Sequence, residues 1–336
     1  MIVPGAVAVP STGTMAEGGG GEVEARGYWA SAWRRLKKDR LAIFSIFVII
    51  AMILIAFVGA PVAQSILGHG PNDLIDNGVI NYAPAPPWTH VKDNSGHETL
   101  LVLGASDLVG RDEFLRLLYG AQVSLEVGIL ATLLGLIVGV AMGMIAGFYG
   151  GFVDTIVSRL TEIVMAFPLL LFLVALAATV GPRLANITLG GVFSPGVVAL
   201  VIVIALFTWF YPARIVRAQV LSLREKEFIE AARMVGSSNL RIMRSHLLPH
   251  VVGSMIVYST LTVAVTILLE STLSFLGVGL PPPSASWGNM LDEALNFYLI
   301  QPWLILWPGI ALLILTLAFN LLGDGLRDAL DPRAKV

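Results

Sequence analysis

Six long apolar stretches separate shorter polar segments along the chain. They cover roughly residues 41–62, 122–147, 162–181, 195–213, 252–276 and 303–322, and none has a charged residue at its middle. A helix that crosses a hydrocarbon core of about 30 Å needs about 20 apolar residues. Buried helices of soluble proteins average about 11–12 residues and keep a polar face. The pattern therefore predicts an all-α membrane protein with six transmembrane helices.

Composition supports this class, because 56% of the 336 residues are hydrophobic, only 13% are charged and the mean hydropathy is +0.81. The first apolar stretch follows the basic sequence "WRRLKKDR". It is longer than the apolar part of a signal peptide, which spans about 7–15 residues, and so predicts a retained anchor. The chain has no cysteine, which excludes disulfides and Cys-based metal or redox sites.

The positions of lysine and arginine predict the orientation of the chain. With the N-terminus inside, 17 of the 21 basic residues fall on inner segments, and the outer segments hold only Lys92, Arg111, Arg116 and Arg183. Inner segments of membrane proteins carry such an excess of positive charge. Both termini are therefore expected to be cytoplasmic.

These expectations divide the chain into five parts. Residues 1–32 are Gly-, Pro- and Ala-rich without periodicity and predict a disordered cytoplasmic tail, in which Met15 is an alternative start. Residues 33–63 form a basic flank and the first transmembrane helix, and residues 64–121 an extracytoplasmic segment. Residues 122–326 form a core of five transmembrane helices that includes an inner loop at 224–249, and 327–336 a cytoplasmic tail. The end of the outer segment, "GRDEFLRLLYGA", is expected to be a helix that lies on the membrane or caps the outer mouth.

The second apolar stretch has four glycines at a spacing of four residues, which are Gly135, Gly139, Gly143 and Gly147. Such a row lets another helix approach closely in a membrane. Two interpretations are open, a static packing seam and a sliding interface between moving helices. Pro168 and Pro308 lie within the third and sixth stretches, where each removes a backbone hydrogen bond and permits a kink.

The fifth stretch is the most polar of the six. Its polar residues recur every four positions, as Ser254, Tyr258, Thr262, Thr266 and Glu270. The four uncharged residues either line an aqueous substrate path or bond to their own helix and its neighbours. Glu270 lies near the outer end of the span, and we expect it to hold the following loop by structural hydrogen bonds.

No motif for catalysis or metal binding is present. The chain lacks the phosphate loop G-x-x-x-x-G-K-[ST], H-E-x-x-H and G-x-S-x-G. His246 and His250 are four residues apart, but Pro249 lies between them and is expected to break the helix that would align them. We therefore predict neither catalytic residues nor metal ligands, which leaves transport, channel and scaffold functions.

The inner loop predicts two short helices. In "REKEFIEAARMV" an apolar face is formed by Phe228, Ala231, Ala232 and Val235, and Gly236 ends the helix. Ser237 or Ser238 can cap the second helix, "NLRIMRSHLL". A helix, turn and basic helix can indicate a DNA reader, but spans on both sides prevent this segment from lying along a duplex. No nucleic-acid partner is expected, since the positive-inside bias already accounts for its arginines.

The sequence "EAARMVGSSNLRIMRSHLLP" resembles the EAA loop of type I ABC importer permeases. Three further stretches narrow the resemblance, namely "GRDEFLRLLYGAQVSL", "ESTLSFLGVGLPPPSASWG" and "GDGLRDALDPR". Together they resemble the C-type permease subunit of dipeptide and oligopeptide importers, a group that also includes nickel and glutathione importers. The resemblance extends from about residue 33 to about residue 332.

This resemblance implies the type I ABC importer permease fold in a bacterial plasma membrane. It implies a homologous B-type permease, two cytoplasmic ABC ATPases and an extracytoplasmic substrate-binding protein as partners, besides the lipid bilayer. ATP and Mg²⁺ would be used by the ATPases and not bound by this chain, which would be no enzyme itself. The residues implied to contact an ATPase or to anchor that contact to the fifth span are Glu230, Ala231, Ala232, Gly236, Leu248 and Pro249.

The chain departs from the family pattern at three positions. His250, Leu115 and Gln122 stand where the family commonly has Asn, Ser and Arg. The resemblance predicts a peptide substrate, with nickel and glutathione as alternatives. A channel or ion-coupled transporter that works without ATP is the alternative from another class. It would require ionisable residues near mid-span, whereas Glu162 and Glu270 lie at span edges.

Overall fold

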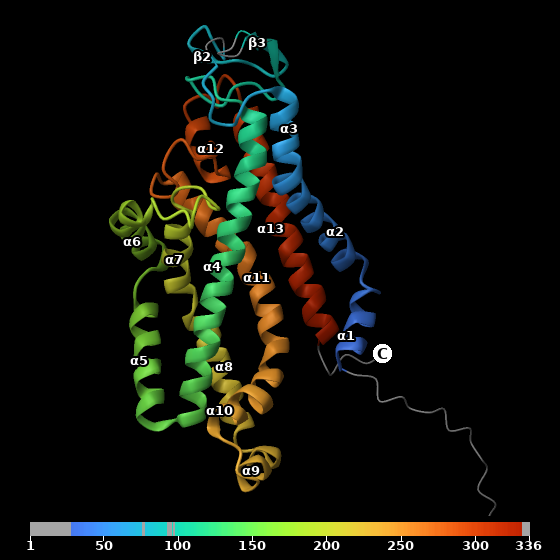
Figure 1. Cartoon of the computed structure of the whole chain (residues 1–336), viewed down its shortest axis with the longest axis vertical. Coiled ribbons are helices and arrows are strands. Elements are labelled where there is room, and N and C mark those ends of the chain that lie inside the picture. Colours follow the sequence, from blue (N-terminus) through green and yellow to red (C-terminus); the bar gives the residue numbers. More distant parts are fainter. Residues whose placement is uncertain (1–27, 76–77, 93–95, 97, 331–336) are drawn as a thin grey trace, which may run out of the picture.

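The computed structural model describes residues 28–75, 78–92, 96 and 98–330. Long helices run along one axis, and a small cap of loops and short strands covers one end (Figure 1). The helical elements are α1 (Tyr28–Leu36), α2 (Arg40–Leu54), the π-helix η1 (Ile55–Gly59), α3 (Ala60–Leu67), α4 (Glu113–Tyr149), α5 (Gly151–Ala166), α6 (Leu169–Leu184), α7 (Val197–Thr208), α8 (Phe210–Leu223), α9 (Glu227–Met234), α10 (Asn239–Arg241), the π-helix η2 (Ile242–Leu247), α11 (Leu248–Phe275), α12 (Trp287–Ala294) and α13 (Trp303–Leu330). The strands are β1 (Val79–Ile80), β2 (Ala83–Pro84), β3 (Thr89–Lys92) and β4 (Glu98–Leu101).

The part of the chain that the structure describes has four helical segments long and apolar enough to cross a membrane, and up to six if two bent pairs are each one span. The four are Arg40–Leu67, Glu113–Tyr149, Asn239–Phe275 and Trp303–Leu330. The bent pairs are α5 with α6, at 91°, and α7 with α8, at 41°. The predicted all-α membrane fold is confirmed, with each bent pair counted as one span.

The third predicted span, over residues 162–181, is bent at Pro168, as the proline there permits. α5 ends at Ala166, and Pro168 is the N-cap of α6. A proline has no N–H to donate, and its ring clashes with the preceding turn, so it favours the start of a new helix. Pro308 has no such effect, because α13 continues through it in its second turn.

Both ends of the chain differ from the predicted tails. Residues 1–27, and with them Met15, lie outside the described residues, but 28–32 belong to α1 rather than to a disordered tail. Leu36 of this helix is buried against Ala42 and Ala329. At the other end, α13 continues through Arg327 to Leu330, and 331–336 lie outside the described residues. The apolar contact between α1 and the end of α13 accounts for the helical structure of both segments.

α4 contradicts the prediction of a separate surface helix at "GRDEFLRLLYGA". It begins at Glu113 and runs for 37 residues, so that the expected boundary between residues 121 and 122 lies inside one helix. The side chain of Asp112 caps its N-terminus by accepting a hydrogen bond from the Leu115 N–H at 2.9 Å. Leu115 and Ala121 are buried, which explains why this segment continues the span instead of lying flat.

The four glycines of α4 face α7 and α8 and form a close helix contact. A Cβ added to Gly139 would lie 2.5 Å from Pro212 Cγ, and one added to Gly147 would lie 2.8 Å from Val220 Cβ. Gly135 and Gly143 meet Thr208 and the Ala213 carbonyl in the same way. Their role in helix packing is therefore visible in the contacts, whereas sliding along this seam stays a prediction.

The cap has its own small core. β1 pairs antiparallel with β2, and β3 with β4. The buried side chains of this core are Ile75, Ala85, Val91, Leu101 and Ala105. Gly110 has a φ of +79° and touches Gly78, a conformation and a distance that a side chain would not allow. The cap lies beyond the ends of α3 and α4 (Figure 1).

The predicted helix break at Pro249 is wrong. Helical structure continues from Asn239 to Phe275, and the π-helix η2 directly precedes Pro249. A π-turn shifts the hydrogen-bond register by one residue, which accommodates the missing N–H and the ring of a proline. Consequently one uninterrupted helix connects the inner loop with the opposite end of the molecule.

Candidate functional site

The loop between α8 and α11 projects from the end of the bundle opposite the cap, with α9 at its tip (Figure 1). A single apolar side chain of α9 anchors it, because Ile229 is fully buried in a cluster with Val220, Ile242 and Leu247. Two ring contacts support this anchor. Arg233 lies 5.7 Å from the centre of the Phe148 ring, and the Phe228 and His250 rings are 5.4 Å apart.

The apolar face predicted for α9 points mainly outward. Val235 is 87% exposed and Phe228 39%, Ala231 is exposed as well, and only Ala232 packs partly against the cluster. Sequence reasoning missed Ile229, because it lies outside the i, i+3, i+4, i+7 pattern. It also missed Met234, which is 83% exposed; Leu240, expected on the apolar side of the second helix, is 70% exposed.

The small and charged residues of the loop are accessible too. Glu230 and Gly236 are exposed, and Gly236 has a φ of +83° with no atom within 4 Å of an added Cβ. Leu248 packs partly against the Ile229 cluster, whereas Pro249 is exposed. The structure thus presents a firmly anchored loop that exposes apolar side chains beside charged ones, a chemistry suited to contact with another protein.

An open cavity of about 1440 Å³ lies between α8, α11 and the end of α13. Of the four polar residues of the fifth span, Ser254 and Tyr258 line it. Gln219 Nε2 donates a hydrogen bond to Ser254 Oγ at 2.9 Å, which places a second polar group beside them. His250 and Arg327 also line this cavity.

The other two polar residues of this row do not line the cavity. Thr266 is fully buried and accepts a hydrogen bond from Thr132 Oγ1 at 3.0 Å. Thr262 Oγ1 donates to the Tyr258 carbonyl at 2.8 Å. This cavity therefore includes only the first two residues of the row, and a substrate path along all four stays a prediction. The row leaves the cavity because, at i+4 spacing, it winds around its helix by about 40° per step.

Glu270 is fully buried between α11 and α4. Its carboxylate accepts hydrogen bonds at 2.8 Å from Ser124 Oγ and at 2.8 Å from Ser274 Oγ, with Ser271 Oγ at 3.3 Å. A buried carboxylate is tolerated when hydrogen bonds satisfy its oxygens. These bonds hold the two helices together directly before the loop that leads to α12.

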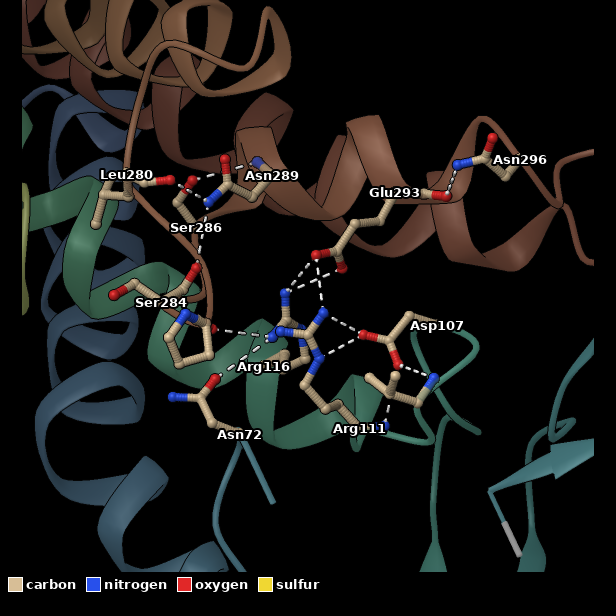
Figure 2. Close-up of polar contacts among 12 residues, drawn as sticks. Asn72, Asp107, Arg111, Arg116, Leu280, Ser284, Ser286, Asn289, Glu293 and Asn296 are labelled. Carbon is tan, nitrogen blue, oxygen red and sulfur yellow. Dashed lines mark hydrogen bonds and ion pairs between the residues drawn. The ribbon is translucent and has the colours of Figure 1, made fainter. Parts of the chain in front are cut away.

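An outer ion-pair cluster, formed by Asp107, Arg111, Arg116 and Glu293, joins the cap to α4 and α12 (Figure 2). The Arg116 side chain is completely buried, and its Nη2 donates to Glu293 Oε1 at 3.1 Å and to Oε2 at 3.0 Å. Arg111 Nη2 reaches Glu293 Oε1 at 3.2 Å and also pairs with Asp107. Burial raises the pKa of Glu293, and the charges of Arg116 and Arg111 oppose this shift.

A second polar contact connects the cap to the start of α4. His69 Nε2 lies 2.9 Å from Asp112 Oδ2, and both side chains are buried. Burial alone lowers the pKa of His69, but the hydrogen bond and the charge of Asp112 outweigh it and raise the pKa above its ordinary value of 6.5. The same Asp112 caps α4, so this contact fixes the cap to the helix end.

The second predicted span, residues 122–147, contains an ionisable residue that the sequence argument omitted. Glu126 lies in α4 and is half-buried, with its Oε1 3.3 Å from Gln122 Nε2. It lies one helical turn beyond Gln122, which lines a cavity of about 200 Å³ near the outer end. Among the residues that the structure describes, no group of three or more His, Cys, Asp or Glu could hold a metal ion.

Two family models of transport permeases match the chain. Residues 139–336 match the family described as "Binding-protein-dependent transport system inner membrane component", and residues 27–87 match the "N-terminal TM domain of oligopeptide transport permease C". The chain therefore belongs to the inner-membrane permeases of binding-protein-dependent transport systems. It is a multi-pass protein of the inner membrane.

Several relatives match over most of their length. The dipeptide transport system permease protein DppC of Alkalihalophilus pseudofirmus is 38% identical, over 91% of this chain and 90% of the relative. The oligopeptide transport system permease protein OppC of Salmonella typhimurium is 40% identical, over 93% of each chain. Among solved structures, the inward-facing methionine ABC transporter MetNI is similar with a TM-score of 0.48 and 19% identity, over 64% of this chain and 96% of that chain.

Proposed function

We propose that this chain is one permease subunit of an ATP-driven importer of di- or oligopeptides, and that it forms half of the translocation pathway. The names of its relatives support a peptide substrate. The observation that carries the mechanism is the unbroken helix Asn239–Phe275, which leads from the exposed inner loop to the opposite end of the bundle. A rigid helix of this kind can transmit a displacement of the loop across the membrane.

The inner loop is the contact for a cytoplasmic ATPase in this proposal. Its exposed apolar residues Met234, Val235 and Leu240 suit a protein partner, since such residues are costly to leave in water. Glu230, Ala231 and Gly236 lie on the same loop, where small residues permit close approach. Ala232, Leu248 and the buried Ile229 hold the loop against the bundle, and Pro249 is placed where it joins α11.

The remaining subunits follow from this assignment. A homologous B-type permease would complete the pathway, two ABC ATPases would bind and hydrolyse ATP with Mg²⁺, and an extracytoplasmic binding protein would deliver the substrate. The chain itself would have no ATPase site and bind no cofactor. Both termini and the inner loop would be cytoplasmic, which the distribution of lysine and arginine supports.

The cavity beside α11 is the inner part of the pathway in this proposal. Gln219, Ser254 and Tyr258 supply neutral hydrogen-bonding groups for a peptide backbone. Its lining includes the cationic Arg327 and contains no Asp or Glu among the described residues. This composition favours a peptide over a free metal cation such as Ni²⁺, because cation paths carry acidic side chains, whereas a cationic arginine repels a metal ion.

The test is uptake by the whole importer in proteoliposomes, with the binding protein outside and ATP inside. We expect uptake of a labelled peptide that stops when ATP is omitted. In parallel, mass spectrometry of the ligand that co-purifies with the binding protein should identify peptides. Nickel or glutathione alone as the ligand would refute the substrate assignment, and uptake without ATP would refute the importer assignment.

A further inference from the structure

Arg116 joins four separate parts of the chain at the outer end (Figure 2). From α4, its Nη2 donates to both oxygens of Glu293 on α12, at 3.1 and 3.0 Å. Its Nη1 lies 3.3 Å from the Pro283 carbonyl in the α11–α12 loop and 3.4 Å from Asn72 Oδ1 in the cap. A two-pronged arginine–carboxylate pair fixes both distance and orientation.

α12 is held by packing along its length, and near its end also by ion pairs. At its start, Trp287 is 1% exposed and its Nε1 donates to the Leu117 carbonyl at 3.0 Å. Gly288 packs so closely on α11 that an added Cβ would lie 2.7 Å from Ser274 Cβ. Near its end, Ala294 is 1% exposed, and the charges of Arg116 and Arg111 hold Glu293, whose side chain is 25% exposed. Packing therefore holds both ends of α12, and the ion pairs of Glu293 add a contact with α4 and the cap that water can reach at the partly exposed carboxylate.

The position of α12 in the chain connects this cluster with the inner loop. The helix Asn239–Phe275 is followed by a short loop, and that loop leads directly into α12. In the present structure the cavity at the inner end is open, at about 1440 Å³, while the ion pairs at the outer end are made. The inner cavity and the outer ion pairs are thus present together in this one structure.

We propose that Arg116 and Glu293 are positioning residues for transport, which hold α12 and its preceding loop against α4 and the cap while the inner cavity is open. Release of the pair lets the α11–α12 loop separate from the cap at the outer mouth. Arg111 and Asp107 share this role, because Arg111 contacts the same carboxylate of Glu293. The inference rests on the proposed function, since displacement of α11 by the ATPases drives the release.

A cysteine at Ser284 provides the reporter. Ser284 lies in the α11–α12 loop, is 9% exposed and lines the small outer cavity with Asn72. The chain has no native cysteine, so within this subunit a membrane-impermeant thiol reagent reacts only with the cysteine introduced at position 284. We expect Glu293→Gln in the assembled importer to raise the reaction rate at Ser284→Cys about tenfold, since a hydrogen bond to a charged group contributes at least that factor to an equilibrium.

Two controls separate positioning from general loosening. Glu98→Gln removes an exposed carboxylate from β4 of the same cap and should leave the rate unchanged. A cysteine at Thr99, 8% exposed in the cap, should react equally slowly with and without Glu293→Gln. An equal rise at Thr99 would overturn the proposal in favour of a purely structural role. If Glu293→Gln does not assemble, Arg111→Gln takes its place, with a smaller rise expected and an unchanged rate counting against the proposal.

Adding ATP and the loaded binding protein distinguishes this inference from the proposed function. In the parent importer these additions should also raise the rate at Ser284→Cys. If they raise it while Glu293→Gln does not, the importer assignment stands and the positioning role of Arg116 and Glu293 is refuted. If Glu293→Gln raises the rate and ATP has no effect, the pair closes the outer mouth but the ATP-coupling part of the proposed function fails.

Discussion

Replacing Ile229 by alanine should detach α9 from the bundle while leaving the spans intact. Ile229 is fully buried. Among the described residues of α9, no other side chain is buried in the cluster with Val220, Ile242 and Leu247. An isoleucine-to-alanine change in a core costs about 2–5 kcal/mol. Because about 1.4 kcal/mol changes an equilibrium tenfold, a middle value of about 3 kcal/mol raises the detached fraction of α9 roughly a hundredfold. An isolated helix of eight residues is then marginal in water.

Hydrogen exchange of the purified importer measures this detachment directly. Backbone amides of Glu227–Met234 should exchange roughly a hundredfold faster in Ile229→Ala, in line with the shifted equilibrium, whereas those of α4 should not change. Substrate-stimulated ATPase activity should fall with it. The matched control is Ile202→Ala in α7, where the same side chain is 40% exposed. Unchanged exchange in α9 would refute the claim that Ile229 anchors the loop.

Three further predictions concern packing, pH and the cavity. Gly147→Leu should lower the unfolding free energy by about 1–3 kcal/mol through overpacking. The control Gly181→Leu should not, because no atom lies within 4 Å of a Cβ added there. Equal thermal midpoints of the two variants would contradict the close contact of the α4 glycines with α8. The carboxylate of Asp112 raises the pKa of His69, although burial opposes this shift. The stability that the contact contributes is therefore fully present below the ordinary pKa of histidine, and it is lost as pH rises through the raised pKa. Thermal unfolding measured from acidic to alkaline pH should show this loss of stability, and His69→Gln should remove the pH dependence. If the pH dependence persists in His69→Gln, another group causes it. A cysteine at Tyr258 should react with a water-soluble thiol reagent much faster than one at Thr266, and equal rates would count against the cavity as a path.

The spans were predictable from sequence because apolar length is a property of each segment alone. The same is true of the glycine seam and of a disturbance at Pro168. The size of the bend there, 91°, was not predictable, since it depends on how α6 packs against α7. It was also not predictable that residues 113–121 of the outer segment continue into the second span as one helix. Charged residues such as Glu113 and Arg116 indicate solvent exposure until their burial partners are known.

The candidate site was predictable where one motif carries it and not where distant segments meet. The exposed inner loop was found from "EAARMVG", but its anchor Ile229 breaks the helical pattern and gave no signal. The Arg116–Glu293 pair joins residues 177 positions apart, which no local spacing could indicate. The contact of Thr266 with Thr132 could not be predicted for a related reason, because which face of a helix lines a cavity depends on its neighbours.

The central claim is that the inner loop touches an ATPase subunit, and site-specific cross-linking tests it most directly. A single cysteine at Ala231, an exposed position of α9, is labelled with a short photoactivated cross-linker in the intact importer. We expect a cross-link to an ATPase subunit whose yield changes when ATP is added, and none from the control cysteine at Tyr82, which is 96% exposed in the cap. Cross-linking of Tyr82 but not Ala231 to the ATPase would contradict the account.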